Sequence, residues 1–259
     1  MKIGIIGLGA LGKTLERAFK KIGHKCFGID IHNSEELSKL ILCEVIFICL
    51  PTNLKKKKLD INLIKYYLNK LVKFKYKGII AIKSTLNIGD INFLKKKFKS
   101  IKKQIIYVPE FLRERFSFHD FTKNHDLLLI GGNKILAKKI IKLHGNYPKK
   151  IKIVKPIEAE IVKLFSNCYN SNRIVFANSF FEICQKLNLN YNKILNTYLL
   201  RNKTTSEYLN CSKNLRGFGG KCLPKDLTTL NTFAKKNTKI KFFDYLLKEN
   251  NKYKTTIIK

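Results

Sequence analysis

The N-terminal segment GIIGLGALGKTLERAF, residues 4–19, constrains the fold more than any other part of the chain. It sets three glycines, Gly7, Gly9 and Gly12, between an apolar run and an amphipathic stretch. This G-x-G-x-x-G spacing predicts a short strand, a tight turn and a helix that ends near Gly23. Glycine is needed at such a turn because the chain bends sharply, a ligand approaches the backbone, and the helix packs close to the strand.

The same segment predicts a dinucleotide site. The helix start presents unpaired N–H groups and a positive dipole end to a pyrophosphate. The next strand, HKCFGID, ends at Asp30, which is placed to accept a hydrogen bond from a ribose 2′-hydroxyl and would repel a 2′-phosphate. The prediction is therefore NAD rather than NADP, and a glycine-rich turn without a ligand is disfavoured. The expected cofactor-binding residues are Gly7, Gly9, Ala10, Leu11, Gly12, Asp30, Thr52 and Thr85.

Apolar runs alternate with helical patterns through the first half of the chain. Strands are predicted over 44–50, 78–84, 104–108 and 125–132, and helices over 33–42 (capped by Asn33 or Ser34), 58–74, 88–100 and 133–145. This alternation predicts an α/β fold, a Rossmann-like doubly wound parallel sheet, as a domain over residues 1–154. Ligands bind beyond the carboxyl ends of such strands, so Thr52, Ser84, Thr85 and Glu110 are expected to line one cleft.

A long helix is predicted over residues 155–188, which have apolar residues at helical spacing and no glycine or proline after Pro156. It opens a predicted helical second domain, residues 155–259. A small domain cannot cover a helix of this length, so we expect a homodimer that packs through it. Lys163 and Asn167 are four residues apart and therefore share one face.

The segment GFGGKCLPKD, residues 217–226, leads a glycine-rich turn into Cys222. Pro224 suits the first turn of a helix, so Cys222 is expected at a helix N-terminus, with Lys221 and Lys225 nearby. Both features stabilise a thiolate, and the glycines leave the thiol accessible. The alternative is that Cys222 is a small buried apolar residue, which is how the other six cysteines are interpreted. Their spacing indicates neither a disulfide framework nor a metal site.

The net charge of +34 would attract polyanions. Abundant lysine, isoleucine and asparagine without tryptophan are also expected of a genome biased toward A and T, and this interpretation is favoured. No zinc-finger, RNP or KH pattern supports nucleic-acid binding. The longest apolar run, residues 40–50, is too short to span a membrane and contains Glu44, and the N-terminus is not a signal peptide. A soluble cytoplasmic protein is expected.

Taken together, these segments resemble the UDP-glucose 6-dehydrogenase / GDP-mannose 6-dehydrogenase family from residue 1 to about 235. The resemblance rests on GFGGKCLPKD, on the acid-rich segment VPEFLRE (108–114), on KSTLNIG (83–89), and on the central helix. It implies that Cys222 is a nucleophile and that Asp226, with Thr85, holds a catalytic water. It also implies that Lys163 and Asn167 stabilise an oxyanion, and that Glu110 and Glu114 position substrate and assist thioester hydrolysis.

The resemblance implies a two-step oxidation of a nucleotide sugar by NAD through a cysteine thioester. Sulfur is needed because an aldehyde must become a hydride donor again. The sequence departs from the family at Lys221 and Arg115, where the family usually has a small hydroxyl residue and glycine. It ends about 33 residues after Asp226, without the family's usual C-terminal domain. Two other interpretations stay open: a one-step NAD-dependent alcohol or hydroxyacid dehydrogenase, and a non-catalytic binding module.

Overall fold

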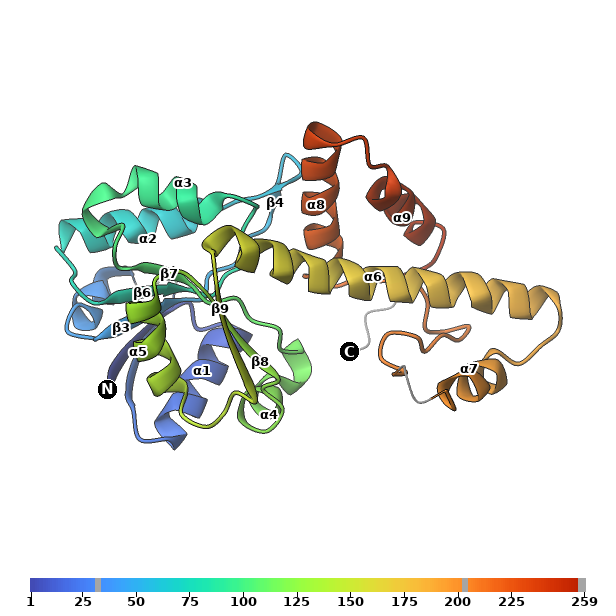
Figure 1. Cartoon of the computed structure of the whole chain (residues 1–259), viewed down its shortest axis with the longest axis horizontal. Helices are drawn as coiled ribbons and strands as arrows, with labels where there is room; N and C mark the ends of the chain where they lie inside the picture. The colour runs from blue at the N-terminus through green and yellow to red at the C-terminus, as the bar shows by residue number, and fades with distance from the viewer. Residues whose placement is uncertain (31–33, 202–204, 256–259) are drawn as a thin grey trace. The chain divides into compact units, whose positions relative to one another are not determined.

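The structure is a computed structural model that describes residues 1–30, 34–201 and 205–255 (Figure 1). Within these residues the chain divides into two compact units. Unit 1 comprises Met1–Asn53 and Leu59–Lys163, and unit 2 comprises Leu54–Lys58 and Leu164–Lys259. Each unit has its own apolar core and is described separately.

Unit 1 is built on a sheet in which, over the described residues, seven strands follow the order β2-β1-β3-β6-β7-β8-β9. The predicted sheet is confirmed, and all but one of its strand pairs are parallel. The strands are β1 (Lys2–Ile6), β2 (Lys25–Ile29), β3 (Val45–Ile48), β6 (Ile79–Ile82), β7 (Ile105–Tyr107), β8 (Leu127–Gly131) and β9 (Lys150–Val154).

Helices cover both faces of this sheet (Figure 1). Because side chains alternate along a strand, Ile3 and Ile5 of β1 enter one apolar core while Ile6 enters the other. The first core is closed by α1 (Ala10–Lys21), α4 (Ser117–Thr122) and α5 (Lys134–His144), and the second by α2 (Asn62–Lys73) and α3 (Asp90–Lys97). Strands buried on both faces explain the continuous apolar runs in the sequence.

One strand pair departs from the parallel arrangement of the others. β8 runs antiparallel to β7, with Tyr107 opposite Gly131. An antiparallel neighbour needs no crossover, so residues 108–126 leave and re-enter the sheet at the same edge. This connection contains the acid-rich segment and the short 3₁₀ helix η3 (Glu114–Phe116). It therefore stays at the carboxyl edge of β6 and β7, where the cleft was predicted.

Two predicted helices differ locally. Of the helix predicted over 33–42, Ser34–Leu40 form a 3₁₀ helix, η1, and Asn33, one of the two proposed caps, lies outside the described residues. The helix predicted from residue 58 begins at Asn62, because a hairpin of β4 (Leu54–Lys55) and β5 (Lys58–Leu59) precedes it. Lys56 and Lys57 make its turn with positive φ angles, a conformation that the lysine-rich sequence did not suggest. A further 3₁₀ helix, η2 (Lys99–Ile101), follows α3.

Unit 2 is helical and confirms the predicted helical region with its long helix. That helix is α6 (Pro156–Lys186), whose first residues up to Lys163 belong to unit 1. The other helices are α7 (Tyr191–Leu199), α8 (Leu223–Asn237) and α9 (Phe242–Asn250). One apolar cluster joins α6 to α7, and a second joins α6 to α8 and α9. A membrane-spanning helix, judged by length and apolar character, is not found among the described residues.

Candidate active site

The glycine-rich turn after β1 has the shape that a phosphate site requires. Gly7 has φ of 96°, and a Cβ there would lie 2.6 Å from the Cys49 carbonyl oxygen. A Cβ on Gly12 would lie 1.9 Å from the Gly7 carbonyl oxygen, whereas one on Gly9 would meet open space. Gly7 and Gly12 therefore allow close packing, and Gly9 leaves room for a ligand against the backbone.

The start of α1 offers N–H donors beside that open space. Its first intrahelical bond runs from the Lys13 N–H to the Gly9 carbonyl, 3.0 Å, so the N–H groups of the preceding turn are left for another acceptor. Asp30 is exposed directly after β2, as the NAD prediction requires. These residues fit the pyrophosphate and ribose of a dinucleotide.

A hollow of about 430 Å³ opens beside the first turns of α1. Its wall includes Lys13, Arg17, Arg115 and His119, so it presents positive charge next to the glycine-rich turn. Arg17 is stacked 4.4 Å above the Phe118 ring, which fixes the position of the guanidinium. Arg115, one of the departures from the family pattern, therefore adds to a surface suited to anionic groups.

The segments after β3 and β6 meet at the carboxyl edge of the sheet. The buried Thr52 hydroxyl donates to the Thr85 carbonyl oxygen, 2.9 Å. The Ser84 N–H and hydroxyl both point to the Ile48 carbonyl, at 3.2 and 3.3 Å. The structure thus brings together Thr52, Ser84 and Thr85, as predicted from their positions after parallel strands.

The two glutamates of the acid-rich segment lie in different environments. Glu110 is buried and forms an ion pair with Lys83, Nζ to Oε2 2.8 Å, whereas Glu114 is exposed on η3. Burial alone would raise the pKa of Glu110, but the positive charge of Lys83 and the N–H of Phe111 hold it below its usual range. Glu110 is therefore a fixed carboxylate, and Glu114 is the accessible one. Lys163 has its Nζ 5.4 Å from the centre of the Phe111 ring.

In unit 2, Cys222 lies where the sequence predicted, at the N-cap of α8, and its side chain is exposed. Asp226, one turn on, is fully buried, and its N–H donates to the Cys222 carbonyl, 3.0 Å. The Asn167 amide donates to Asp226 Oδ2, 2.5 Å, and Lys225 Nζ lies 2.8 Å from Asp226 Oδ1. The structure thereby joins two predicted site residues, Asn167 and Asp226, one turn from the thiol.

All seven cysteines are within the described residues, and all are free thiols. Burial raises the pKa of Cys26 and Cys211 to about 11 and that of Cys49 and Cys168 to about 12. Thiols with raised pKa values are poor nucleophiles near neutral pH. Cys222 is the exposed thiol of the set.

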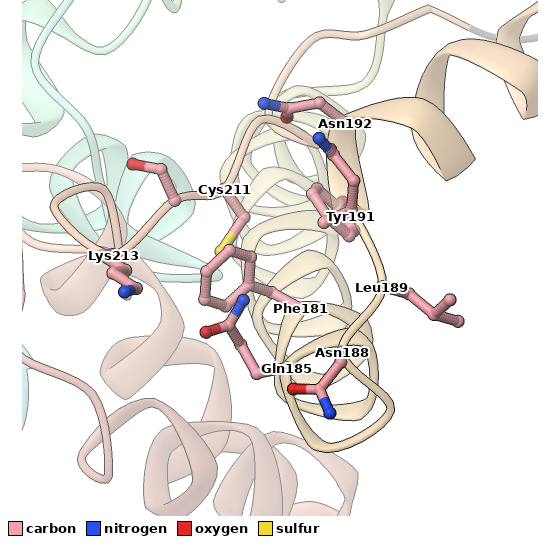
Figure 2. Close-up of a pocket in the computed structure, with 10 residues that line it drawn as sticks. Phe181, Gln185, Asn188, Leu189, Tyr191, Asn192, Cys211 and Lys213 are labelled. Atoms are coloured by element: carbon pink, nitrogen blue, oxygen red, sulfur yellow. The ribbon is translucent and has the colours of Figure 1, made fainter.

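A second hollow, of about 490 Å³, lies in unit 2 between the end of α6, the start of α7 and residues 211–213 (Figure 2). Phe181, Tyr191 and Cys211 belong to the apolar cluster beneath it. Asn190 caps α7 by accepting from the Lys193 N–H, so part of its polar lining has a structural role. Cys222, Asn167 and Asp226 are not among its described lining residues.

Four polar residues were missed by the sequence reasoning. Lys83 could have been noticed, because a lysine directly follows the apolar run of β6. Glu160 and Asn178 are buried polar residues of α6. Both occupy positions where the helical pattern of the sequence calls for an apolar residue, and this could have indicated a buried polar contact. Asn250, at the end of α9, gave no signal, because asparagine at a helix end is common.

The comparisons with known proteins agree with this geometry. Residues 32–144 match the description "UDP-glucose/GDP-mannose dehydrogenase family, NAD binding domain", and residues 157–252 match the central domain of the same family. UDP-glucose 6-dehydrogenase of Campylobacter jejuni is 37% identical over 155 residues, which are 58% of this chain and 38% of that protein. UDP-glucose 6-dehydrogenase TuaD of Bacillus subtilis is 27% identical over 70% of this chain and 40% of that protein. The matches thus span about two fifths of these relatives.

Solved structures share the fold. A UDP-glucose dehydrogenase from Pyrobaculum islandicum has a TM-score of 0.84 at 21% identity, covering 97% of this chain and 68% of that one. A 3-hydroxyisobutyrate dehydrogenase from Mycobacterium tuberculosis has a TM-score of 0.74 at 13% identity, covering 97% of this chain and 92% of that one. The fold is therefore shared with a hydroxyacid dehydrogenase, and the two matched domains identify the family. The chain belongs to the UDP-glucose/GDP-mannose dehydrogenase family and carries its NAD-binding and central domains.

Proposed function

We propose that the protein oxidises the C6 alcohol of a nucleotide sugar, such as UDP-glucose, to the uronic acid with NAD. The observation that carries the proposal is the exposed Cys222 at the start of α8, one turn before the buried Asp226. A thiol placed this way can attack an aldehyde, and the adjacent carboxylate can orient water. Family membership supports the substrate class.

NAD, when bound, supplies the hydride acceptor for both oxidations. Gly7, Gly9, Ala10, Leu11 and Gly12 would hold its pyrophosphate and Asp30 its ribose, with Thr52 and Thr85 at the strand ends. The open space at Gly9 and the donors at the start of α1 are the features that fit this group.

The residues of the chain would divide the chemistry as follows. Lys163 and Asn167 stabilise the negative charge on the substrate oxygen, which develops as its proton is removed or as the thiolate adds, and is lost when the hydride leaves and the carbonyl forms. The Cys222 thiolate adds to the aldehyde carbon and forms a thiohemiacetal, whose oxidation gives a thioester. Water oriented by Asp226 attacks that carbon, the C–S bond breaks, and the carboxylate and thiol are released. Glu114 is the accessible carboxylate for substrate contact and for this hydrolysis.

The number of NADH molecules formed per substrate tests the proposal. Two NADH per UDP-glucose consumed, with UDP-glucuronate as the product, is the expected result. One NADH per substrate favours a one-step dehydrogenase, a second candidate that the similarity to a hydroxyacid dehydrogenase fold supports. A screen that finds no NADH with any nucleotide sugar or hydroxyacid would leave a non-catalytic binding module.

We also propose that a second copy of the chain packs against α6. Within unit 2, exposed apolar side chains recur along this helix at a helical spacing: Phe165, Tyr169, Phe176, Phe180 and Ile183. Between Leu164 and Gln185 the sequence has no lysine and one arginine, Arg173, although the chain carries 52 lysines and arginines. Two copies of a strongly basic chain repel each other elsewhere, so this lysine-free apolar stripe is the surface on which they can meet.

A further inference from the structure

The glycine-rich turn before Cys222 is held by two buried asparagine side chains. Asn178 lies on α6 and is 1% exposed, and Asn250 ends α9 and is 5% exposed. Each belongs to a helix far from the turn in sequence, and all of these residues lie in unit 2. Buried amides are costly unless they are hydrogen-bonded, so their partners show what they do.

Asn250 pairs with both backbone polar groups of Phe218. Its Oδ1 accepts from the Phe218 N–H, 2.7 Å, and its Nδ2 donates to the Phe218 carbonyl, 3.1 Å. The Phe218 ring is buried in the cluster that contains Cys168, Val175, Leu227 and Leu246. Both the backbone and the side chain of Phe218 are therefore fixed.

Asn178 holds the two preceding residues. Its Oδ1 accepts from the Gly217 N–H, 3.2 Å, and from Arg216 Nε, 2.6 Å, while its Nδ2 donates to the Ile174 carbonyl, 2.7 Å. Arg216 also pairs with Glu182, one turn further along α6. Residues 216 and 217 are thus attached to the side of α6.

The turn itself needs glycine at Gly217, which has φ of 46°. A Cβ there would lie 3.2 Å from Asn250 Oδ1 and 3.3 Å from the Tyr253 Cβ. Gly220, by contrast, has open space around it. Residues 216–218 are therefore held in place by hydrogen bonds. The turn that follows them is open, and the chain is fixed again at Leu227 of α8, which packs in the same apolar cluster as Phe218.

We propose that Asn178 and Asn250 are positioning residues for the Cys222 thiol, an inference that rests on the proposed function for its catalytic consequence. Cys222 lies between residues 216–218, which the two asparagines hold, and the start of α8. The hydrogen bonds of Asn178 and Asn250 therefore fix the N-terminal end of the short segment that carries the nucleophile. A misplacement of about 1 Å can cost on the order of 100-fold in rate. The loss should fall on the steps that use sulfur, because the first oxidation does not need the thiol.

Asn250→Ala tests this inference, with Asn251→Ala as the matched control, because Asn251 is the exposed neighbour. Hydrogen exchange of the 216–222 backbone is expected to accelerate at least about ten-fold in Asn250→Ala, because the Phe218 N–H loses its acceptor. Exchange across residues 164–176 of α6 should stay as in the wild type, which confirms that the variant is folded. Asn250→Asp keeps the acceptor and loses the donor, so its exchange should be intermediate.

The kinetic arm measures each oxidation separately, with UDP-glucose for the first and its 6-aldehyde for the second. Asn250→Ala is expected to lower kcat for the aldehyde by about 100-fold and to leave NAD binding and the first oxidation within about three-fold of the wild type. Equal losses in both oxidations, or wild-type exchange over 216–222, would overturn the inference. If the wild type oxidises no nucleotide sugar, the proposed function fails, and the exchange arm still decides whether the asparagines hold the Cys222 segment.

Discussion

Lys83 and Glu110 join the segments that follow β6 and β7 through an ion pair that is almost wholly buried. Their side chains are 0% and 9% exposed, with Nζ 2.8 Å from Oε2. The two strands are adjacent and parallel, so their carboxyl ends lie side by side. Lys83 precedes Ser84 and Thr85, and Glu110 lies in the acid-rich segment, so the pair fixes both segments relative to each other.

Removing one partner should therefore be costly. Lys83→Met is expected to lower the free energy of unfolding by about 3–5 kcal/mol, because it leaves a buried carboxylate unpaired. Adding Glu110→Leu should recover much of that loss. Urea unfolding of the single and double variants measures the coupling, and the exposed Lys77→Met should change stability by less than about 0.5 kcal/mol. If Lys83→Met unfolds at the same urea concentration as the wild type, the ion pair does not stabilise the segments that follow β6 and β7.

Asp30 should decide between the two nicotinamide cofactors. Asp30→Ala is expected to reduce the preference for NAD over NADP by about ten-fold or more, equivalent to about 1.4 kcal/mol, because the repulsion of a 2′-phosphate is removed. Binding titrations of both cofactors measure this without any turnover. Asp126→Ala, at another exposed acid of unit 1, is the control. Equal affinities of the wild type for NAD and NADP would reject the assignment.

Cys222 should be the first thiol to react. Iodoacetamide at neutral pH is expected to label Cys222 ahead of the other six cysteines, and NAD with substrate should protect it. Cys222→Ser should lose turnover by about 1,000-fold or more while still binding NAD, because a hydroxyl stays protonated near neutral pH. Cys26→Ser is the control, because burial raises the pKa of that thiol to about 11. Two NADH per substrate from Cys222→Ala at the wild-type rate would refute covalent catalysis.

Glu160 should make unit 1 less stable as pH rises toward neutrality. Burial raises the pKa of Glu160 to about 7, although its carboxylate accepts from the N–H groups of Gly89, 2.6 Å, and Ile91, 2.7 Å. Between its usual pKa of 4.5 and about 7 the folded state binds the proton more tightly than the unfolded state, so this contribution to the unfolding free energy falls as pH rises.

Glu160→Gln is expected to flatten that dependence between pH 5 and 8, measured by urea unfolding at each pH. Glu16→Gln, which removes an acid of α1, should leave the slope unchanged. The contribution of Glu110 changes with pH in the opposite direction, because the pKa of Glu110 is lowered in the folded state. Glu110 therefore stabilises the fold above its usual pKa of 4.5, and this stabilisation is lost as pH falls through the lowered value. Identical slopes in the wild type and Glu160→Gln would contradict the assignment to Glu160.

The apolar stripe of α6 should hold two copies together. Phe176 and Phe180 are 55% and 43% exposed, with ring centres 4.7 Å apart. Phe176→Glu is expected to weaken the dimer by at least about 2 kcal/mol, a 30-fold rise in dissociation constant, since it buries a charge in an apolar contact. Sedimentation at micromolar concentration measures this, with Phe93→Glu, in unit 1, as the control. A wild-type monomer would remove this role for α6.

Features that depend on neighbours along the chain could be predicted from the residues alone. The glycine spacing around Gly7, the apolar strands, the long helix and the start of α8 at Cys222 were all readable, because turns, periodicity and helix starts are set by local sterics and hydrogen bonding. The family followed from the same segments, since the motifs that carry it are contiguous.

Features that join residues far apart in the sequence appear only in the folded chain. The antiparallel β7–β8 pair, the burial of Glu110 on Lys83 and the pairing of Asn250 with Phe218 each join segments whose separation no local pattern encodes. Glu110 and Glu114 looked alike in the sequence, yet one is a buried partner and the other is exposed. Burial and pairing are properties of the folded chain, because they arise only when distant segments exclude water together.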